Sequence, residues 1–507
     1  MICKKRKGQT MDKTMNPPEI LCIKDNCKDT NLNGESKKKI TLNPDGFYGR
    51  VEHKNILKRL LVEIRPVNFR EVIGLDAGVD LKQKHILFAI IKKMLQTAKQ
   101  KQWNLCKAYD YTYIYNGAYW KQCSKEDIKK FLTDAAIKMG LPDYEAKHYE
   151  FAEKLQKQFL SDSYLPAPEP DTNKILINLH NGTFEFTNND WKQRDFSPDD
   201  FLTYQLPFGY DADATCPLFD KYLLRVLPDE SSRMVLQEFA GFIFTKLNLE
   251  KCLVLTGEGG NGKTVFFDIL NALIGAENIL NYSIGLFKEP YNRAKLTNVL
   301  LNYSDEKGFD LNPDIFKNLV SGTPVQACEK YCSPFTLYNK VKFMFNCNKL
   351  PSENENTKAY YRRFLIIPFD EEITEEEKNI NLAKKIITNE LPGVFNWLLR
   401  GLERIIHQQK FSYCEKAEKA LGNFRKQGDN VQLFIEEQSY QHSKNNREAL
   451  NNLYTNYKDF CHDDGYKPKG KNNFSKELER KDFEKIRMND GYYFSIEKKN
   501  DNEKNVF

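Results

Sequence analysis

The sequence predicts an α/β protein with a parallel β-sheet at its centre and a smaller domain on either side. An apolar run, Cys252–Leu255, leads into the glycine-rich segment Gly257–Thr264, and a helical pattern follows over Val265–Ile274. Apolar strands and helical patterns then alternate up to about residue 412. Such alternation is typical of a parallel sheet that is covered by helices on both faces.

Length and composition indicate a soluble protein with several domains. The 507 residues are too many for one hydrophobic core, and 40% apolar residues can fill more than one. No uncharged apolar run approaches the roughly 20 residues that span a bilayer, and no apolar segment follows the basic residues of Met1–Lys7. The twelve cysteines lack paired C-x-x-C spacing, which favours free thiols over a zinc site. We therefore expect a cytoplasmic protein, located in a bacterial cytosol or in the cytosol of a virus-infected host. Its net charge of +6 is compatible with a nucleic-acid partner but does not identify one.

The N-terminal part divides into a polar tail and an α+β domain. Residues 1–45 are rich in Lys, Asn, Asp and Thr, which predicts a disordered tail. Residues 46–200 combine helical spacing with strand pairs centred on turns, and we assign them to one domain. Its expected elements are a helical region, a hairpin, two helices and a second β unit, at Val51–Gln102, Tyr113–Trp120, Ser124–Met139, Tyr144–Leu160 and Ile175–Phe186.

The sheet domain is assigned to residues 201–415 and begins with helices over Leu218–Leu227 and Ser231–Thr245. Residues 425–507 have a different pattern, with three short helices and then two strands. These elements are expected at Val431–Glu437, Glu448–Cys461, Asn473–Arg480, Phe483–Met488 and Tyr492–Ile496. Three helices followed by a hairpin are the order of a winged-helix domain.

The segment Gly257–Thr264 has the spacing G-x-x-x-x-G-K-T of a phosphate-binding loop, or P-loop. Glycines in such a loop let backbone N–H groups approach phosphate oxygens, and the following helix adds the positive end of its dipole. Lys263 would reach the β- and γ-phosphates of ATP, and Thr264 would hold Mg2+. The candidate nucleotide-binding residues are Gly257, Gly259, Gly260, Asn261, Gly262, Lys263 and Thr264. A glycine-rich turn without a ligand is the alternative.

An enzyme with this loop also needs acidic residues at the end of a neighbouring strand. The apolar strand that starts at Val299–Leu301 ends in Asp305 and Glu306. Asp305 is the candidate magnesium ligand, and Glu306 is the candidate for orienting or deprotonating the attacking water. A solvated turn is the alternative for this pair.

Polar residues flank two later apolar strands. Asn348 follows the strand Val341–Phe345, where it would hold the attacking water or contact the γ-phosphate, and satisfying the strand end is its alternative role. Arg362 and Arg363 precede the strand Phe364–Phe369. The planar, permanently charged arginine side chain suits stabilisation of a phosphoryl group that is bound by another subunit. A structural ion pair is the alternative for either arginine.

These motifs, in this order, resemble those of the superfamily 3 helicases, in particular the helicase part of phage and plasmid primase-helicases and of the poxvirus primase-helicase. The resemblance extends from about residue 108 to the C-terminus, and the stretches Tyr204–Asp220, Leu236–Gly241 and Lys317–Tyr331 also carry it. It implies an AAA+ ATPase core, preceded by a collar-type domain, that assembles as a homo-oligomeric ring. The ring is usually a hexamer with ATP between subunits.

The resemblance also implies a role for each matching residue. The lysine and threonine of the loop become the phosphate and magnesium contacts, the acidic pair becomes the Walker B pair, and Asn348 becomes the sensor. Arg363 is the favoured arginine finger acting in trans, closely followed by Arg362. Lys330 and Tyr331 become the tip of a hairpin that grips one DNA strand in the central channel. A lysine pairs with phosphate, and an aromatic ring stacks without reading sequence.

The leading interpretation is therefore a magnesium- and ATP-dependent DNA helicase that translocates on single-stranded DNA and unwinds forked duplex during replication of a phage, plasmid or other mobile element. Two alternatives stay open. One is a DNA-assembled AAA+ initiator or loader without processive unwinding, and the other is a monomeric small-molecule kinase. Because only about 100 residues precede the matching region, we expect no primer synthesis from this chain. A separate primase or polymerase is then a candidate partner.

The C-terminal domain carries basic residues that would follow a duplex backbone. Those on or just before the expected recognition helix are Lys467, Lys469, Lys471, Lys476 and Arg480. Acidic residues are interleaved with them, so docking to another protein is the alternative.

Overall fold

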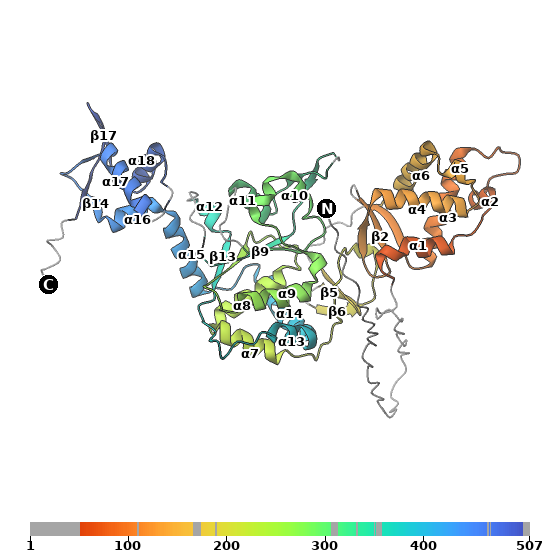
Figure 1. Ribbon diagram of the computed structural model, residues 1–507, viewed down its shortest axis with the longest axis horizontal. Coiled ribbons are helices and arrows are strands. Elements are labelled where there is room, and N and C mark those ends of the chain that lie inside the picture. Colours follow the sequence, from red (N-terminus) through yellow and green to blue (C-terminus); the bar gives the residue numbers. More distant parts are fainter. Residues whose placement is uncertain are drawn as a thin grey trace, which may run out of the picture.

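The computed structural model of the protein describes residues 51–108, 111–165, 174–187, 190–305, 313–330, 333–348, 350, 357–463, 466 and 468–499. The expected tail, residues 1–45, lies outside these described residues. Figure 1 shows an α/β body in the centre of the molecule, with an N-terminal body on one side and a C-terminal body on the other. None of the described helices is both long enough and apolar enough to cross a membrane.

The N-terminal body consists of helices packed against one antiparallel sheet. Its helices are α1 (His53–Glu63), α2 (Phe69–Ile73), α3 (Gln83–Gln100), α4 (Lys125–Lys138), α5 (Asp143–Ala146) and α6 (Tyr149–Asp162). Its strands are β1 (Asn104–Ala108), β2 (Tyr111–Tyr115) and β3 (Trp120–Cys123), in that spatial order. Leu87, Ile91 and Met94 recur at helical spacing on α3 and are buried in the core of this body. The predicted helices and hairpin are thus confirmed, except that the helix over Tyr144–Leu160 is divided into α5 and α6 and that β1 was not predicted.

The central sheet has five parallel strands, as the alternating pattern predicted. They are β7 (Cys252–Thr256), β8 (Ile279–Leu280), β9 (Leu301–Asp305), β12 (Lys342–Cys347) and β13 (Phe364–Pro368). Their spatial order is β13-β7-β12-β9-β8, and each neighbouring pair is parallel. β12 therefore lies between β7, which precedes the glycine-rich loop, and β9, which ends in Asp305.

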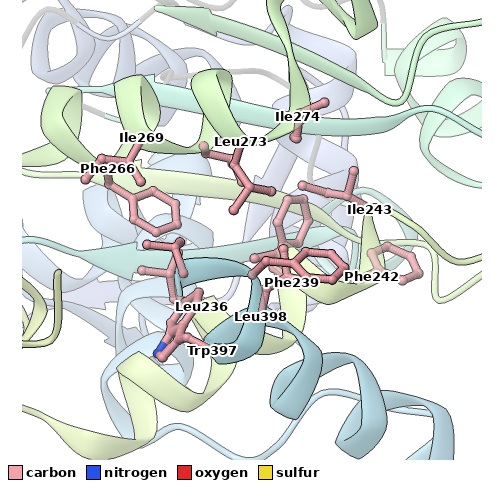
Figure 2. Packing of buried hydrophobic residues seen from close by; sticks show 14 of the residues in the cluster. Leu236, Phe239, Phe242, Ile243, Phe266, Ile269, Leu273, Ile274, Trp397 and Leu398 are labelled. Carbon is pink, nitrogen blue, oxygen red and sulfur yellow. The ribbon is translucent and has the colours of Figure 1, made fainter. Parts of the chain in front are cut away.

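Helices cover both faces of this sheet. On one face lie α7 (Pro217–Val226), α8 (Glu230–Phe242), α9 (Lys263–Ile274), α13 (Leu382–Asn389) and α14 (Leu391–Gln408). On the other face lie α10 (Pro290–Ala294), α11 (Pro313–Val320), α12 (Lys358–Tyr361) and α15 (Glu415–Gly428). Short 3-10 helices occur at Pro198–Asp200, Ala276–Asn278 and Ile284–Lys288. Leu253 and Leu255 of β7 face the first of these helical layers, and Cys252 and Val254 face the second. Figure 2 shows side chains of α8, α9 and α14 packed together in the first layer.

Helices α8 and α14 approach each other closely at glycine positions. A Cβ on Gly241 would lie 2.5 Å from the backbone nitrogen of Leu402, and a Cβ on Gly401 would lie 2.3 Å from a backbone carbonyl oxygen of α8. Beside this contact, the fully buried Glu238 accepts a hydrogen bond from Nε of Arg404 at 3.1 Å. Only glycine permits this backbone contact, and the ion pair fixes the register of the two helices.

The second antiparallel sheet, β4 (Ile175–Leu179), β5 (Gly182–Thr187) and β6 (Asp190–Arg194), packs with the central body. Ile177, Leu179 and Phe184 are buried in one cluster with side chains of α7, α8 and α14. The ring of Phe184 meets that of Phe395 on α14. The predicted boundary near residue 200 is therefore too far downstream, because the apolar faces of these strands join the central core.

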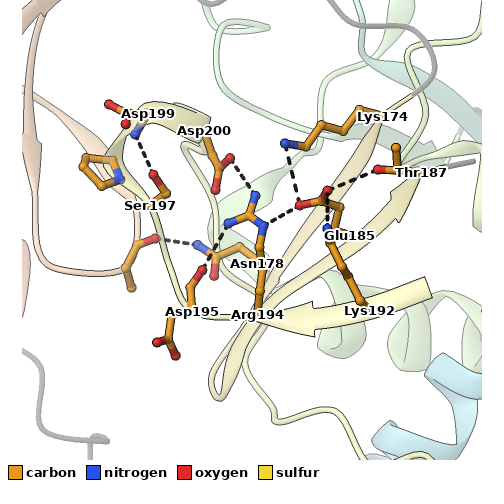
Figure 3. Close-up of polar contacts among 12 residues, drawn as sticks. Lys174, Asn178, Glu185, Thr187, Lys192, Arg194, Asp195, Ser197, Asp199 and Asp200 are labelled. Carbon is orange, nitrogen blue, oxygen red and sulfur yellow. Dashed lines mark hydrogen bonds and ion pairs between the residues drawn. The ribbon is translucent and has the colours of Figure 1, made fainter. Parts of the chain in front are cut away.

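A buried carboxylate ties this second sheet together (Figure 3). Glu185 of β5 is 6% exposed and forms ion pairs with Arg194 of β6, Lys174 and Lys192. Burial favours a raised pKa for Glu185, but the hydrogen bond from Arg194 and the charge of Lys174 outweigh it and lower the pKa to about 2. Arg194 also pairs with Asp200 at 2.7 Å. The carboxylate therefore stays charged inside the fold and connects β5 to β6 and to the turn that follows.

Helix α15 connects the central body to the C-terminal body (Figure 1). Leu421 and Phe424 of α15 are buried against the central body, where the ring of Phe424 meets those of Tyr361 and Phe364. The central body thus extends through α15, and the predicted boundary between residues 415 and 425 falls inside this helix.

The C-terminal body has three helices followed by a hairpin, as predicted, and also short strands that were not predicted, two of them between its first and second helices. Its helices are α16 (Asn430–Glu437), α17 (Leu450–Asp463) and α18 (Lys471–Arg480). Its strands are β14 (Tyr440–His442), β15 (Glu448–Ala449), β16 (Lys485–Met488), β17 (Gly491–Phe494) and β18 (Ile496–Lys498). Glu448, predicted as the start of a helix, lies instead in β15, because it pairs with Phe494 of β17.

Candidate functional site

The glycine-rich loop lies between the end of β7 and the start of α9, at the carboxyl edge of the central sheet. Gly257 has a φ of 146°, and a Cβ there would lie 2.3 Å from the carbonyl oxygen of Phe369. Gly262 has a φ of 89°, and a Cβ there would lie 2.8 Å from Cγ1 of Val226. At Gly259, a Cβ would meet no described atom within 4 Å. The loop is thus braced by the protein near its ends and open in its middle, where phosphate oxygens would approach.

Lys263, the first residue of α9, holds its ammonium group inside the loop. The residue is 4% exposed, and burial lowers the pKa of its side chain. Its Nζ donates hydrogen bonds to the carbonyl oxygens of Gly257 at 2.7 Å and Glu258 at 3.1 Å, and to Oδ1 of Asn261 at 2.8 Å. Asn261 in turn donates from Nδ2 to the carbonyl oxygen of Phe369 at 2.8 Å. These partners of Lys263 are neutral, so an anionic phosphate competes well for its ammonium group.

Thr264 is exposed and lies one helical turn before Asp268 on α9. The pKa of Asp268 is raised by burial and by the negative charge of Asp305, so this side of α9 faces the end of β9. Residues four apart share a helix face, and Thr264 therefore lies toward the same edge of the sheet.

Asp305 ends β9 and is held by two donors. Its Oδ1 accepts hydrogen bonds from Nδ2 of Asn346 at 2.7 Å and from the hydroxyl of Tyr303 at 2.9 Å. Its Oδ2 has no hydrogen-bond partner in the part of the chain that the structure describes and is available to a ligand. Burial and the carboxylate of Asp305 raise the pKa of Tyr303, so its hydroxyl stays a donor. The predicted partner Glu306 lies outside the described residues.

Asn346 is a site residue that the sequence analysis missed. It lies on β12 between Leu255 of β7 and Asp305 of β9 in the strand register. Its own Oδ1 is buried without a hydrogen-bond partner among the described residues. The predicted sensor Asn348 is exposed just beyond β12, two residues further along and hence on the same face. The alternation of Asn346 and Asn348 at the strand end was the signal available in the sequence.

The residues at this edge suit a magnesium nucleotide. No cluster of three or more His, Cys, Asp or Glu side chains that could hold a metal occurs in the described ranges. Magnesium is commonly held by one or two protein oxygens, by waters and by the phosphates of a nucleotide. The hydroxyl of Thr264 and the available oxygen of Asp305 fit that set.

Arg362 and Arg363 lie at the opposite, amino edge of the sheet. Arg363 directly precedes β13, and its carbonyl oxygen accepts a hydrogen bond at 2.8 Å from the N–H of Cys252, the first residue of β7. The side chain of Arg363 is 9% exposed and donates to the hydroxyl of Ser321 and to a backbone carbonyl. The side chain of Arg362 is 58% exposed and pairs with Glu250 at 2.6 Å. One arginine is held within the chain, and the other is presented at the surface.

The segment after α11 forms an antiparallel hairpin, as the resemblance implied. Its strands are β10 (Val325–Ala327) and β11 (Phe335–Leu337). Lys330 is exposed in the connection between them, and Tyr331 lies outside the described residues. Nε of Arg293 on α10 donates a hydrogen bond at 2.6 Å to the carbonyl oxygen of Gln326, which anchors the hairpin to the central body.

The C-terminal body presents part of the predicted basic surface. The exposed basic residues of α18 are Lys471, Lys476 and Arg480. Arg480 forms an ion pair with Glu477 at 2.7 Å. Lys469 is only 8% exposed, with its Nζ 3.8 Å from Glu477, so the expectation that it faces a duplex is wrong. Lys467 lies outside the described residues.

Three family models match consecutive parts of the chain. "D5 N terminal like" matches residues 91–228, a family of unknown function (DUF5906) matches residues 255–363, and "Poxvirus D5 protein-like" matches residues 426–506. The middle match covers the glycine-rich loop, the end of β9 and the hairpin. The predicted resemblance to the phage- and poxvirus-type primase-helicases is confirmed.

A relative of this kind is the protein named "Putative helicase L207/L206" of Acanthamoeba polyphaga mimivirus. It is 24% identical over 275 residues, which are 51% of this chain and 28% of that protein. This chain thus spans less than two thirds of the length of that relative.

Two solved structures of the NrS-1 C-terminal region are also similar. The A form apo structure is 13% identical and covers 65% of this chain and 73% of that chain, with a TM-score of 0.41. Another apo structure is 14% identical and covers 79% of this chain and 97% of that chain, with a TM-score of 0.45.

Proposed function

We propose that this chain is a magnesium- and ATP-dependent DNA helicase of the superfamily 3 AAA+ type. It forms a ring, translocates on single-stranded DNA and unwinds duplex during replication of a phage, plasmid or other mobile element. The observation that carries this proposal is the placement of two sets of residues at opposite edges of one parallel sheet. The phosphate loop and Asp305 lie at the carboxyl edge, and Arg362 lies at the amino edge. The family matches and the mimivirus relative support the helicase part.

The residues at the carboxyl edge divide the work of ATP hydrolysis. The ammonium group of Lys263 exchanges its carbonyl partners for the β- and γ-phosphates, and Thr264 and Asp305 hold the magnesium ion. When bound, this ion neutralises charge that develops on the phosphates. Glu306 takes the proton of the attacking water, and Asn348 orients that water.

The two arginines are too far from the phosphate loop of their own chain to serve it. β7 has five residues, and at about 3.3 Å per residue they separate its two edges by roughly 16 Å. An arginine side chain spans less than half of that distance. An arginine that serves a nucleotide from this edge would therefore reach that of a neighbouring subunit, as in a closed ring with head-to-tail interfaces.

Of the two arginines, Arg362 suits this role better than the Arg363 that the sequence favoured. Its side chain is 58% exposed, whereas that of Arg363 is 9% exposed and bound within its own chain. A single pairing with Glu250 holds Arg362, and an exposed ion pair of this kind is weak enough to exchange for a phosphate.

The hairpin β10–β11 is the proposed contact to single-stranded DNA. The exposed Lys330 pairs with a backbone phosphate, and Tyr331 stacks on a base or sugar. The C-terminal body is proposed to be a winged helix. Its Lys476 and Arg480 would follow a duplex backbone without reading sequence.

A strand-displacement assay on a forked duplex tests the proposal, with Lys263→Ala as the inactive control. The wild-type protein should hydrolyse ATP faster when single-stranded DNA is added and should release the labelled strand, whereas Lys263→Ala should do neither. Stimulated hydrolysis without strand release would favour the initiator or loader alternative. A monomer whose turnover ignores DNA would favour the small-molecule kinase.

The ring and the arginine assignment need a second test, in which variant and wild-type subunits are mixed. Arg362→Ala should retain nucleotide binding, lose turnover and inhibit wild-type subunits more than in proportion to its share. Inhibition in simple proportion would contradict action in trans. Inhibition by Arg363→Ala but not by Arg362→Ala would restore the ranking that the sequence suggested.

A further inference from the structure

Ser321 connects two parts of the chain that the sequence separates. It is 8% exposed and lies between α11 and β10, at the base of the hairpin. Its hydroxyl oxygen accepts hydrogen bonds from Nη2 of Arg363 at 2.6 Å and from Nε of the same residue at 3.0 Å. Its carbonyl oxygen accepts another from Nδ2 of Asn248 at 2.6 Å. Ser321 therefore belongs to the hairpin by sequence and to the edge of the central sheet by its hydrogen bonds.

The partner of Ser321 is fixed to the sheet. The backbone of Arg363 is hydrogen-bonded to Cys252 of β7, and its buried guanidinium contacts Ser321 and lies 3.6 Å from Glu250, so the guanidinium cannot move without affecting these neighbours. Two donors of one planar guanidinium converge on a single hydroxyl, which fixes both the distance and the direction of the contact. The chain then turns at Gly322, which has a φ of 64°, and leads into β10.

We propose that Ser321 is a positioning residue that couples the arginine segment at the subunit interface to the DNA-contacting hairpin. This inference rests on the proposed function, because it takes Arg362 as the group that meets the nucleotide of the neighbouring subunit. When Arg362 leaves Glu250 for that nucleotide or returns to it, the guanidinium of Arg363 responds, because its Nη2 lies 3.6 Å from the same Oε2 of Glu250. The contact between Arg363 and Ser321 then carries that movement into β10 and so to the DNA.

Loss of the hydrogen bonds between Arg363 and Ser321 should leave some activities of the protein intact, which distinguishes a coupling role from a purely structural one. Arg362 keeps its ion pair with Glu250 when Ser321 is altered, because Glu250 lies 2.6 Å from Arg362 and farther, at 3.6 Å, from Arg363. The phosphate loop and Asp305 lie at the other edge of the sheet. ATP binding and basal hydrolysis should therefore persist, and only their connection to the hairpin should fail.

Ser321→Ala, compared with Ser321→Thr in the full-length chain, tests this coupling. The alanine variant should hydrolyse ATP without DNA within about twofold of the wild-type rate, but its stimulation by single-stranded DNA should fall about fivefold or more. The number of base pairs opened per ATP should fall with it. The threonine variant keeps a hydroxyl at the same position and should restore both quantities.

If Ser321→Ala lowers the stability of the protein, a double-mutant cycle with Arg363 still tests the coupling. Arg363→Lys retains the charge but cannot present two converging donors to one hydroxyl. If the two residues act through this contact, Ser321→Ala combined with Arg363→Lys should lose about as much stimulation as the more affected single variant, and the two losses should not add. Thermal unfolding of each variant shows whether a loss instead follows the fraction of folded protein.

The outcomes separate the coupling from the proposed function. A wild-type chain that neither responds to single-stranded DNA nor releases a strand overturns both. An active wild type with an equally stimulated Ser321→Ala variant overturns the coupling alone. Additive losses in the cycle, or a Ser321→Thr variant as impaired as Ser321→Ala, also overturn it.

Discussion

Replacing Asn346 by leucine tests whether the carboxylate of Asp305 must be held in place for hydrolysis. Asn346 donates one of the two hydrogen bonds that Oδ1 of Asp305 accepts, at 2.7 Å, and the other comes from Tyr303. Leucine has a similar volume and no donor. The substitution also removes Oδ1 of Asn346, a buried oxygen that has no hydrogen-bond partner in the described part of the chain. The fold should therefore tolerate the change, and the loss should fall on the orientation of Asp305.

A hydrogen bond to a charged group contributes about 1.5–3 kcal/mol. If the orientation of Asp305 is needed in the transition state, losing one such bond should lower kcat/KM for ATP hydrolysis by roughly 10- to 100-fold. Steady-state hydrolysis with varied ATP measures this loss, and thermal unfolding checks that the variant is folded.

Tyr303→Phe is the matched control, because it removes the other donor to the same oxygen and leaves the ring stacked on Phe267. It should lower kcat/KM by a similar factor. If both variants remain within about threefold of the wild-type rate, the geometry around Asp305 does not control the reaction and this reasoning is refuted.

Three further predictions concern the loop, the central core and the N-terminal body. Gly257→Ala should weaken ATP binding at least about tenfold, because its Cβ would meet a backbone carbonyl oxygen at 2.3 Å; unchanged affinity in equilibrium binding would contradict this. Glu238→Ala should lower the free energy of unfolding by about 1.5–3 kcal/mol, since it removes the acceptor of Nε of Arg404 and of Ser412, and denaturant unfolding measures the change. Burial lowers the pKa of His53 from 6.5 to about 4, so the unfolded chain binds a proton that the folded chain does not. The free energy of unfolding that is present above pH 6.5 should thus decrease as the pH falls toward 4. A His53→Gln variant with the same pH dependence would show that the decrease does not come from His53.

Local patterns in the sequence were sufficient for most elements and for the position of the glycine-rich loop between β7 and α9. Helical spacing, apolar runs and the Asn–Gly turns act within a few residues, so most helices and both N-terminal hairpins appear where expected. The loop was equally predictable, because its spacing and the flanking strand and helix are contiguous. Glu306 and Tyr331 stay predictions, since both lie outside the described residues.

Long-range packing decided what the local patterns left open. Strands β4 to β6 follow the N-terminal helices in sequence, yet their apolar faces are buried in the central core. Whether Glu448 extends a helix or pairs with Phe494 also depends on a strand far along the chain.

The sequence by itself determined the candidate nucleotide-binding residues, because their spacing lies within one short segment. Only the tertiary structure decided which side chains meet across the sheet and which ones are exposed. The order of the strands places Asn346 next to Asp305, and the burial of Arg363 leaves Arg362 as the arginine that can reach outward. Neighbours across a sheet and the exposure of a side chain arise from the folding of distant segments onto one another, and no spacing within a single segment specifies them.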